Sequence, residues 1–589
     1  MTLGAGRFVA VKLLTPLLLA MACGSDPAAT GGDADPGSAR DAQTDAAPQS
    51  DAGPQVDVHS CDAPVACGTC EDDLVCMQGR CVEEGSVIVA NDAELAAAIT
   101  NGTTSNILIA PGTYSLADMA KGIDRTANPL TIQGLNPDDR PVFQNATQSL
   151  ILTRHVSFQN LSFVATEDLG GIWFSDGGGN GTGGDAHDIA ISCSDFTALD
   201  PGDKNNSTPT PNYASGMTSL FRFSNFATYN YTLRNIDAEY VYQIGDFRMN
   251  GNVVIDNLDV DFWYFDGIRI IASGEEGYVE GNRLIANVDL TNNLAVYNEM
   301  GNNAPHPDST QVFNTGSSAN NTNPSVQNLV FYRNRFNPGQ FRSSNAQAGL
   351  SQSPMTNVGY IENIWATKGS VHGISLEGGG RGVLIERNTI ADVDWQASPW
   401  IRIFRTDSQI IVADSFFPSG FNTTAAGANA NRLGFELDDL NNQTSSSYDE
   451  FFNGPSSLGG IASLVTMFTP TQVSTIGALN VNGEWRGGAH RPMRARAPIL
   501  ASGTGQFSVT TLHEPTLQSP DQTAVGGDLY SRFDLRWSQA GSNAWTVITD
   551  VSESDVVQSV SRGAIDVQTR CVNSAGEGLW SFTAAATVN

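Results

Sequence analysis

The chain reads YIENIW at residues 360–365 and IERNTI at residues 385–390. In both segments an apolar residue comes two or three positions before an asparagine, and another follows within three positions. The same pattern occurs as SFQNLSF (157–163), TLRNIDAEY (232–240), VIDNLDV (254–260), VEGNRLI (279–285) and FYRNRF (331–336). The asparagines are separated by approximate multiples of roughly 25 residues, which is the spacing expected of stacked solenoid coils.

We expect these asparagines to stack as one ladder at a bend between short strands. They are Asn160, Asn235, Asn257, Asn282, Asn334, Asn363 and Asn388. Asparagine tolerates left-handed backbone angles and can hydrogen-bond to equivalent residues above and below it. The pattern predicts an all-β fold with a right-handed parallel β-helix. A β-sandwich is the alternative, but strands joined by hairpins do not give a coil-length period.

The segment before the first repeat predicts a cap for the solenoid. Residues 92–99 form a short amphipathic helical pattern, and the apolar strand 107–110 and the turn Pro111-Gly112 follow it. This opening resembles the N-terminal cap of pectate-lyase-like β-helices. The resemblance implies a β-helix over residues 86–493, with irregular closing coils after about residue 420. Members of that superfamily include polysaccharide lyases, hydrolases, epimerases and binding proteins, so the fold does not define a reaction.

The N-terminus predicts export from the cytoplasm. Two basic residues precede an apolar run, Leu13 to Ala22, which is short for a membrane-spanning helix and typical of a signal peptide (1–22). The order Leu-Ala-Met-Ala-Cys resembles a bacterial lipobox, which implies lipidation of Cys23. Gly24 after the cysteine then implies sorting to the outer membrane, with surface exposure expected. An ordinary cleaved secretory signal, and a periplasmic or secreted protein, is the alternative.

Residues 23–60 contain few large apolar side chains and predict a disordered acidic tether. The whole chain has a formal net charge of −31. Such a charge makes nucleic acid an unlikely partner class and is typical of a solvated extracellular surface. It also allows carboxylates to bind Ca²⁺, although it identifies no metal site.

Five of the eight cysteines lie in the segment 61–85, which indicates disulfides formed in an oxidising compartment. They are Cys61, Cys67, Cys70, Cys76 and Cys81. A zinc knuckle through Cys67 and Cys70 is the alternative, but no second pair has that spacing. Two bridges leave one odd thiol, which either pairs with Cys193 or Cys571 or stays free.

The last segment, residues 494–589, contains FDLRWSQ, AWTVIT and IDVQTRCVNSAGEGLWS. It resembles a fibronectin type III module, and the resemblance implies a β-sandwich. The sequence departs from that family at Ile565, where a tyrosine is usual, and at Thr511 and Leu512, where a core tryptophan is common. We expect local packing to differ there.

The candidate catalytic residues lie in NNAPHPDSTQVF, where His306, Asp308 and Gln311 fall within six residues. A histidine beside a carboxylate can act as a general base, and a strand would hold both groups on a rigid frame. The segment resembles a His-x-Asp-x-x-Gln element found in uncharacterised β-helix proteins. Alternatively, Asp308 caps a turn and Gln311 stacks in a polar ladder, or the group binds a cation.

A second candidate segment is DFWYFDGIRI, which contains Trp263, Asp266 and Arg269. Stacked coils could bring Asp266 close to Asp308, and two carboxylates across a groove are what glycoside hydrolysis requires. Trp263 could stack on a sugar ring, and Arg269 could neutralise a uronate. In the alternative, Asp266 forms a turn and the aromatic residues belong to the core.

These features predict a surface lipoprotein that binds and in one hypothesis cleaves an extracellular polysaccharide, as a lyase or a glycoside hydrolase. A non-catalytic glycan-binding, adhesive or structural protein is the alternative. An acidic groove, which the net charge leads us to expect, would repel a polyuronate unless Ca²⁺ intervened. No nucleotide, nicotinamide or flavin motif is present. The sequence identifies neither the sugar nor the oligomeric state.

Overall fold

The computed structural model describes Cys61, Cys70, residues 74–77 and residues 80–589 with internal gaps. The longest gaps are 199–217, 273–293, 297–307, 315–325, 337–348, 423–435, 453–463 and 513–531. Most elements in the described ranges are β-strands, which confirms the all-β expectation. Within these ranges no helix has the length and apolarity needed to cross a membrane.

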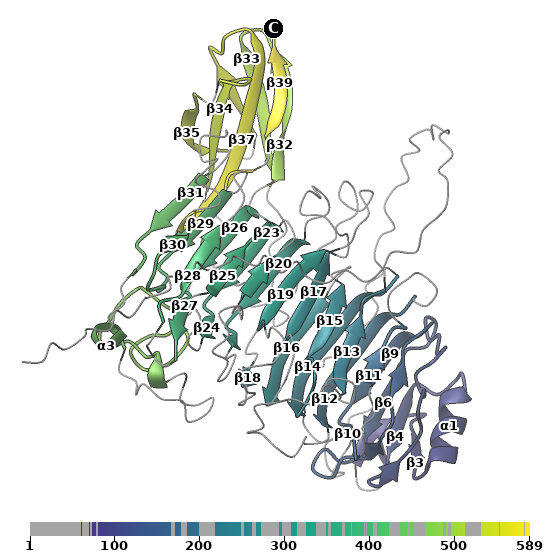
Figure 1. The fold of residues 1–589 in the computed structure, drawn as a ribbon. Helices are drawn as coiled ribbons and strands as arrows, with labels where there is room; N and C mark the ends of the chain where they lie inside the picture. The colour runs from purple at the N-terminus through teal and green to yellow at the C-terminus, as the bar shows by residue number, and fades with distance from the viewer. Residues whose placement is uncertain are drawn as a thin grey trace, which may run out of the picture. The chain divides into compact units, whose positions relative to one another are not determined.

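Three sheets of parallel strands form the body (Figure 1). Sheet 1 contains β3 (Val87–Val89), β4 (Asn106–Ile109), β5 (Thr113–Tyr114), β6 (Leu130–Gly134), β7 (Val142–Gln144), β9 (Arg154–Gln159), β10 (Ser162–Val164), β12 (His187–Thr197), β14 (Tyr229–Glu239), β16 (Val253–Asp261), β18 (Leu294–Val296), β21 (Arg335–Phe336), β24 (Ile364–Thr367) and β27 (Thr389–Asp392). Sheet 2 contains β8 (Gln148–Ser149), β11 (Ile172–Ser175), β13 (Ser219–Phe223), β15 (Gly245–Arg248), β17 (Ile268–Ala272), β19 (Thr310–Asn314), β22 (Gly349–Ser351), β25 (His372–Leu376), β28 (Trp400–Ile403) and β30 (Phe421–Asn422). Sheet 3 contains β20 (Val326–Tyr332), β23 (Met355–Ile361), β26 (Gly380–Glu386), β29 (Gln409–Ala413) and β31 (Glu436–Leu440).

The chain passes through these sheets in a repeating order, and one passage through the sheets is called a coil. From β20 onward it passes through sheet 3, sheet 1 and sheet 2 in turn, so that β20 pairs with β23, β21 with β24 and β22 with β25, all in parallel. Side chains alternate along each strand, and one set points into a shared core. Phe143, Phe163 and Phe196 stack in that core with ring centroids 5.3 and 5.0 Å apart.

The repeated asparagines occupy two neighbouring positions of one bend, not a single ladder. Asn160, Asn235 and Asn257 have φ of 53°, 53° and 51°, the left-handed conformation that asparagine tolerates. In later coils the preceding residue takes this conformation, at Arg333 and Glu362 for example.

In those later coils the asparagine itself points inward. Asn334 donates from Nδ2 to Asn363 Oδ1 at 2.7 Å, and Asn363 donates to Asn388 Oδ1 at 3.0 Å. The expected hydrogen bonds between asparagines are therefore confirmed for these three residues. They are also confirmed for Asn257, which donates to Asn235 Oδ1 at 2.7 Å, whereas Asn282 lies outside the described residues.

Helix α1 (Asp92–Thr100) begins where the sequence predicts it, and it packs on β3 and β4. The Asn91 side chain accepts the backbone N–H of Glu94 at 3.0 Å, and Glu94 accepts that of Ala90 at 2.8 Å, which is a reciprocal cap. Arg125 donates to the carbonyl oxygens of Ile99 and Asn101 at the other end. The helix covers the first coil, as expected.

The cysteine-rich segment is attached to the outside of sheet 1. Its hairpin, β1 (Leu74–Met77) and β2 (Arg80–Glu83), places Val82 against Leu108 and Leu135. A disulfide joins Cys61 to Cys193 in β12, so the odd thiol of the segment has its partner there.

The remaining cysteines of the segment agree with the disulfide prediction where the structure describes them. Cys70 is bonded to Cys81, which excludes a zinc knuckle, and Cys76 is also disulfide-bonded. Cys67 lies outside the described residues, and Cys571 is a buried free thiol.

The segment after β31, which the sequence predicts as irregular closing coils, also packs on the outer face of sheet 1. Near α3 (Tyr448–Phe451), the side chains of Tyr448, Phe452 and Phe468 pack on Ile364 and Ala391 of sheet 1. The residues of sheet 1 in this contact alternate with core residues, so the segment lies on the outer face of that sheet.

The terminal unit consists of two antiparallel sheets. One contains β32 (Arg496–Gly503), β33 (Gln506–Leu512) and β36 (Ser554–Gln558); the other contains β34 (Arg532–Gln539), β35 (Thr546–Val551), β37 (Gly563–Asn573), β38 (Gly576–Glu577) and β39 (Ala584–Val588). Phe507 and Val509 from the first sheet and Leu535 and Val567 from the second share one buried core. Ile565 lies in this core, at the place where the resemblance predicted a departure.

Candidate functional site

A row of polar side chains crosses sheet 2 from strand to strand. Nine polar residues lie in register along it, with Leu350 between Gln311 and Ser375: Ser149, Ser175, Arg222, Asp246, Arg269, Gln311, Ser375, Arg402 and Asn422. Their strand neighbours Phe247, Ile270 and Val312 are buried in the core, so the row lies on the outer face. Neighbouring strands are roughly 4.8 Å apart, so the polar residues of the row recur at multiples of that distance, although Ser375 is buried.

The centre of the row is a connected network. The Nη1 atom of Arg269 lies 3.1 Å from Asp246 Oδ1. Its Nε atom donates to Gln311 Oε1 at 3.2 Å. Gln243 donates from Nε2 to the same oxygen of Asp246, Oδ1, at 2.8 Å. Arg222 lies 4.0 Å from Asp246 and has about half of its side chain exposed. The structure thus brings the predicted residues Arg269 and Gln311 together.

The row carries three arginines, Arg222, Arg269 and Arg402, against one aspartate. It is therefore basic, contrary to the acidic groove expected from the net charge. One row of sheet 1 has the opposite charge, because Asp195, Asp237 and Asp259 lie in register on its strands.

One of these carboxyl groups has a shifted pKa. Burial and the nearby Asp195 raise the pKa of Asp237, while Arg140, which pairs with Asp195, acts in the opposite direction. The two rows therefore differ in charge, and of these two only the basic row suits an anionic ligand.

Asp308 is fully buried at the start of β19. Its backbone oxygen accepts the N–H of Gly267 at 2.8 Å, so the two predicted segments meet at this point. Gly267 has no room for a side chain, because a Cβ would lie 2.4 Å from the Ser309 oxygen. Burial suits the alternative role of Asp308 as a residue of the turn.

Three of the predicted site residues lie outside the described residues: His306, Asp266 and Trp263. Their roles stay predictions, as does lipidation of Cys23, which is also outside them. Near the row, no three metal-ligating side chains converge among the residues that the structure describes. The Ca²⁺ expectation therefore also stays a prediction.

Arg222 and Arg402 were not among the site residues predicted from the sequence, although a sequence pattern points to them. FRF (221–223), IRI (268–270) and IRI (401–403) each place an arginine between two apolar residues. In a strand this pattern points the two apolar side chains inward and the arginine outward. The three tripeptides together would have predicted Arg222 and Arg402 beside Arg269.

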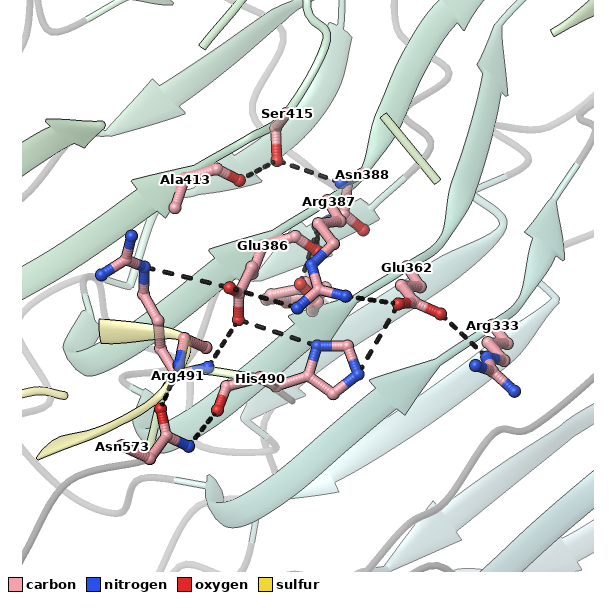
Figure 2. Close-up of polar contacts among 12 residues, drawn as sticks. Arg333, Glu362, Glu386, Arg387, Asn388, Ala413, Ser415, His490, Arg491 and Asn573 are labelled. Atoms are coloured by element: carbon pink, nitrogen blue, oxygen red, sulfur yellow. Dashed lines mark hydrogen bonds and ion pairs between the residues drawn. The ribbon is translucent and has the colours of Figure 1, made fainter. Parts of the chain in front are cut away.

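Sheet 3 carries a separate buried polar cluster (Figure 2). Glu362 accepts from Arg333 at 2.9 Å and from Arg387 at 3.0 Å, and is fully buried. The imidazole of His490 lies between Glu362 and Glu386, with nitrogen–oxygen distances of 3.7 and 3.8 Å.

Backbone contacts complete this cluster. Glu386 accepts the N–H of Arg491 at 2.9 Å, and Asn573 of the terminal unit donates to the His490 oxygen at 2.6 Å. Burial, with Arg387 and Arg333, holds the pKa of His490 well below its usual value, and burial raises the pKa of Glu386. Because the side chains are buried, we assign the cluster to attachment of the segment at His490 and not to substrate contact.

No protein-family model matches this chain, and no curated protein is significantly similar to it in sequence.

Proposed function

We propose that the chain is an exported lipoprotein whose right-handed parallel β-helix binds an extended acidic polysaccharide along sheet 2. The observation that carries the proposal is the basic polar row through Arg222, Arg269 and Arg402. Arg222 and Arg269 lie two strands apart, and Arg269 and Arg402 lie four strands apart. The arginines thus recur at multiples of one strand spacing, which suits a polymer that repeats the same anionic group, and arginine forms two parallel hydrogen bonds with a carboxylate or sulfate.

The outer faces of the other sheets support the choice of sheet 2. The segment that contains Tyr448 and Phe468 packs on sheet 1, and Leu579 of the terminal unit packs on Val330 and Leu384 of sheet 3. Apolar residues on the outer faces of sheets 1 and 3 therefore pack against other segments of the chain. The corresponding row on sheet 2 is polar and in part exposed, as a binding surface for a hydrophilic chain requires.

The β-helix assignment rests on the rotation of the chain through three parallel sheets and on the inward asparagine ladder. The fibronectin type III assignment of the terminal unit is supported by its sheet composition, with β32, β33 and β36 in one sheet and β35, β34, β37 and β39 in the other. A signal peptide, Cys23 and the tether support export and anchoring, and the disulfides fit an oxidising compartment.

Binding of the purified full-length chain to a polyuronate, a sulfated glycan and neutral dextran tests the proposal by calorimetry. We expect the anionic polymers to bind and the affinity to fall with added salt. Arg222→Gln and Arg402→Gln should each weaken binding roughly tenfold, because a charge-assisted hydrogen bond contributes about 1.5 kcal/mol. Arg562→Gln, an exposed arginine of the terminal unit, is the matched control and should bind like the unchanged chain. Equal binding of dextran, or equal losses in all three variants, would contradict the proposal.

Cleavage is examined in the same samples by looking for shortened products with and without Ca²⁺. If the unchanged chain forms product and a His306→Ala, Asp308→Ala variant does not, the predicted segment also has a catalytic role. Binding without product would leave the chain as a glycan-binding surface protein.

A further inference from the structure

A second cluster of functional side chains lies on sheet 1, where β9 and β12 begin. The pairs His187–Arg154 and Ile189–Val156 are in register, so Asp188 lies beside His155 of the preceding coil. Asp188 Oδ2 is 3.4 Å from His155 Nε2 and 2.7 Å from His187 Nδ1. Among the residues that the structure describes, His155, His187 and Asp188 form the group whose ligand atoms converge, all lying within 4.8 Å of one another.

These separations are close to those of a metal site. Ligands around a tetrahedral Zn²⁺, each roughly 2.0–2.1 Å from the ion, are roughly 3.3 Å apart. The His155–Asp188 distance already has this value. The shorter His187–Asp188 contact is a hydrogen bond, and a cation would replace the shared proton and separate the two atoms by a few tenths of an ångström.

Outer contacts orient two of the three ligands, Asp188 and His187. Asn230, which lies beside Asp188 in the following coil, donates to Asp188 Oδ1 at 3.2 Å and leaves Oδ2 for a cation. The Tyr229 ring stacks on the His187 ring with centroids 4.5 Å apart and fixes its plane. The far nitrogen of His187, Nε2, faces Asp185 at 3.9 Å. A carboxylate behind a histidine is the usual second contact of a metal ligand.

The charge of the cluster also suits a divalent cation. Arg154 pairs with Asp124 at 2.8 Å and with Asp185. With Asp188 added, three carboxylates face one guanidinium, which leaves two negative charges when both imidazoles are neutral. About a quarter of the His155 side chain and a third of the Asp188 side chain are exposed, so a cation and a water molecule can reach the site.

We propose that His155, His187 and Asp188 bind a divalent transition-metal cation, Zn²⁺ being the species that two imidazoles and one carboxylate suit best. Ca²⁺ and Mg²⁺ are disfavoured, because they require oxygen ligands. The site uses residues of sheet 1 that take no part in the polysaccharide row. It goes beyond the proposed function and does not depend on it.

The test is a titration of the metal-depleted full-length chain with Zn²⁺ alone, followed by calorimetry and by elemental analysis after dialysis. We expect one Zn²⁺ per chain, a higher melting temperature with the metal, and no response to Mg²⁺. Line shifts of the His155 and His187 ring protons should accompany binding. Two variants, His155→Asn and His187→Gln, should each weaken Zn²⁺ binding at least a hundredfold.

The variants are chosen to preserve folding. His155 has φ of 53°, and asparagine accepts this conformation where most residues do not. Equal melting temperatures of variant and unchanged chain in the absence of metal would show that the fold is intact. His372→Gln, a histidine of sheet 2, is the control and should retain full binding. Zn²⁺ that binds with unchanged affinity to both site variants, or an unchanged chain that binds none, would overturn the proposal.

Discussion

At the scale of the residue, Asn363 explains why the repeat uses asparagine. Its Oδ1 atom accepts the side chain and the backbone N–H of Asn334, and its Nδ2 atom donates to Asn388 and to the carbonyl oxygen of Phe331. The bend leaves these buried backbone groups without strand partners, and a side chain that both donates and accepts satisfies them in each coil.

We predict that Asn363→Ala lowers the free energy of unfolding by roughly 2–4 kcal/mol, because it leaves a buried N–H and a buried C=O unsatisfied. Urea denaturation of the two proteins measures this difference. Asn482→Ala, in an exposed turn, is the control and should change stability by less than about 0.5 kcal/mol. A similar loss in both variants would show that the ladder contributes nothing specific.

His490 predicts a pH dependence of stability. Its pKa in the folded chain lies below the value of 6.5 that it has when exposed, so the unfolded chain binds more protons as the pH falls below 6.5. The contribution of His490 to the free energy of unfolding is therefore present above that pH and is lost as the pH falls below it. The raised pKa of Glu386 acts in the opposite sense, since its contribution is present below 4.5 and is lost as the pH rises.

Replacing His490 by glutamine should therefore flatten the stability curve between pH 7 and pH 5, by up to about 1.4 kcal/mol per pH unit. Urea denaturation at a series of pH values gives both curves. Parallel curves for the two proteins would contradict the assignment of this dependence to His490.

At the scale of the element, local signals in the sequence predicted local structure well. The helix at residues 92–99 and the short strands follow from patterns within a few residues of one another. The asparagine period predicted the repeat, but not the shift from Asn257 to Asn334 between two positions of the bend. The strands keep their register, in which Asn257 corresponds to Arg333, and moving the asparagine by one residue hardly changes its spacing in the sequence. The partner of Cys61 could not be chosen from the sequence, since 132 residues separate it from Cys193.

That long separation gives a prediction for the cysteine-rich segment. A disulfide restricts the unfolded chain more when it closes a longer loop, so Cys61→Ser should cost about 2 kcal/mol more than Cys70→Ser. The Cys70–Cys81 bridge spans 11 residues and provides the matched comparison. Guanidinium denaturation without reductant measures both losses. Equal losses of the free energy of unfolding in the two variants would mean that the bridge to Cys193 does not restrict the conformations of the unfolded chain more than the short bridge does.

At the scale of the whole molecule, charge is the property that the sequence described least well. The net charge of −31 predicted an acidic groove, whereas the fold gathers Arg222, Arg269 and Arg402 in one row and carboxylates on another sheet. A sum over the chain contains no information about faces, because the register of strands far apart in the sequence decides which charges become neighbours. The same reason hid the histidine and aspartate cluster, whose residues come from two coils.

The contact between sheet 3 and the terminal unit gives a prediction about cooperativity. Leu579 is buried against Val330, Ile361 and Leu384, and Asn573 binds the His490 oxygen, so the two parts share buried surface and should unfold together. Leu579→Asp places a charge in this apolar contact and should give two calorimetric transitions where the unchanged chain gives one. Val556→Asp, a change at an exposed position of the same unit, should keep the single transition. Two transitions already present in the unchanged chain would mean that the contact adds too little free energy to couple the parts, and the terminal unit would then unfold as an independent module.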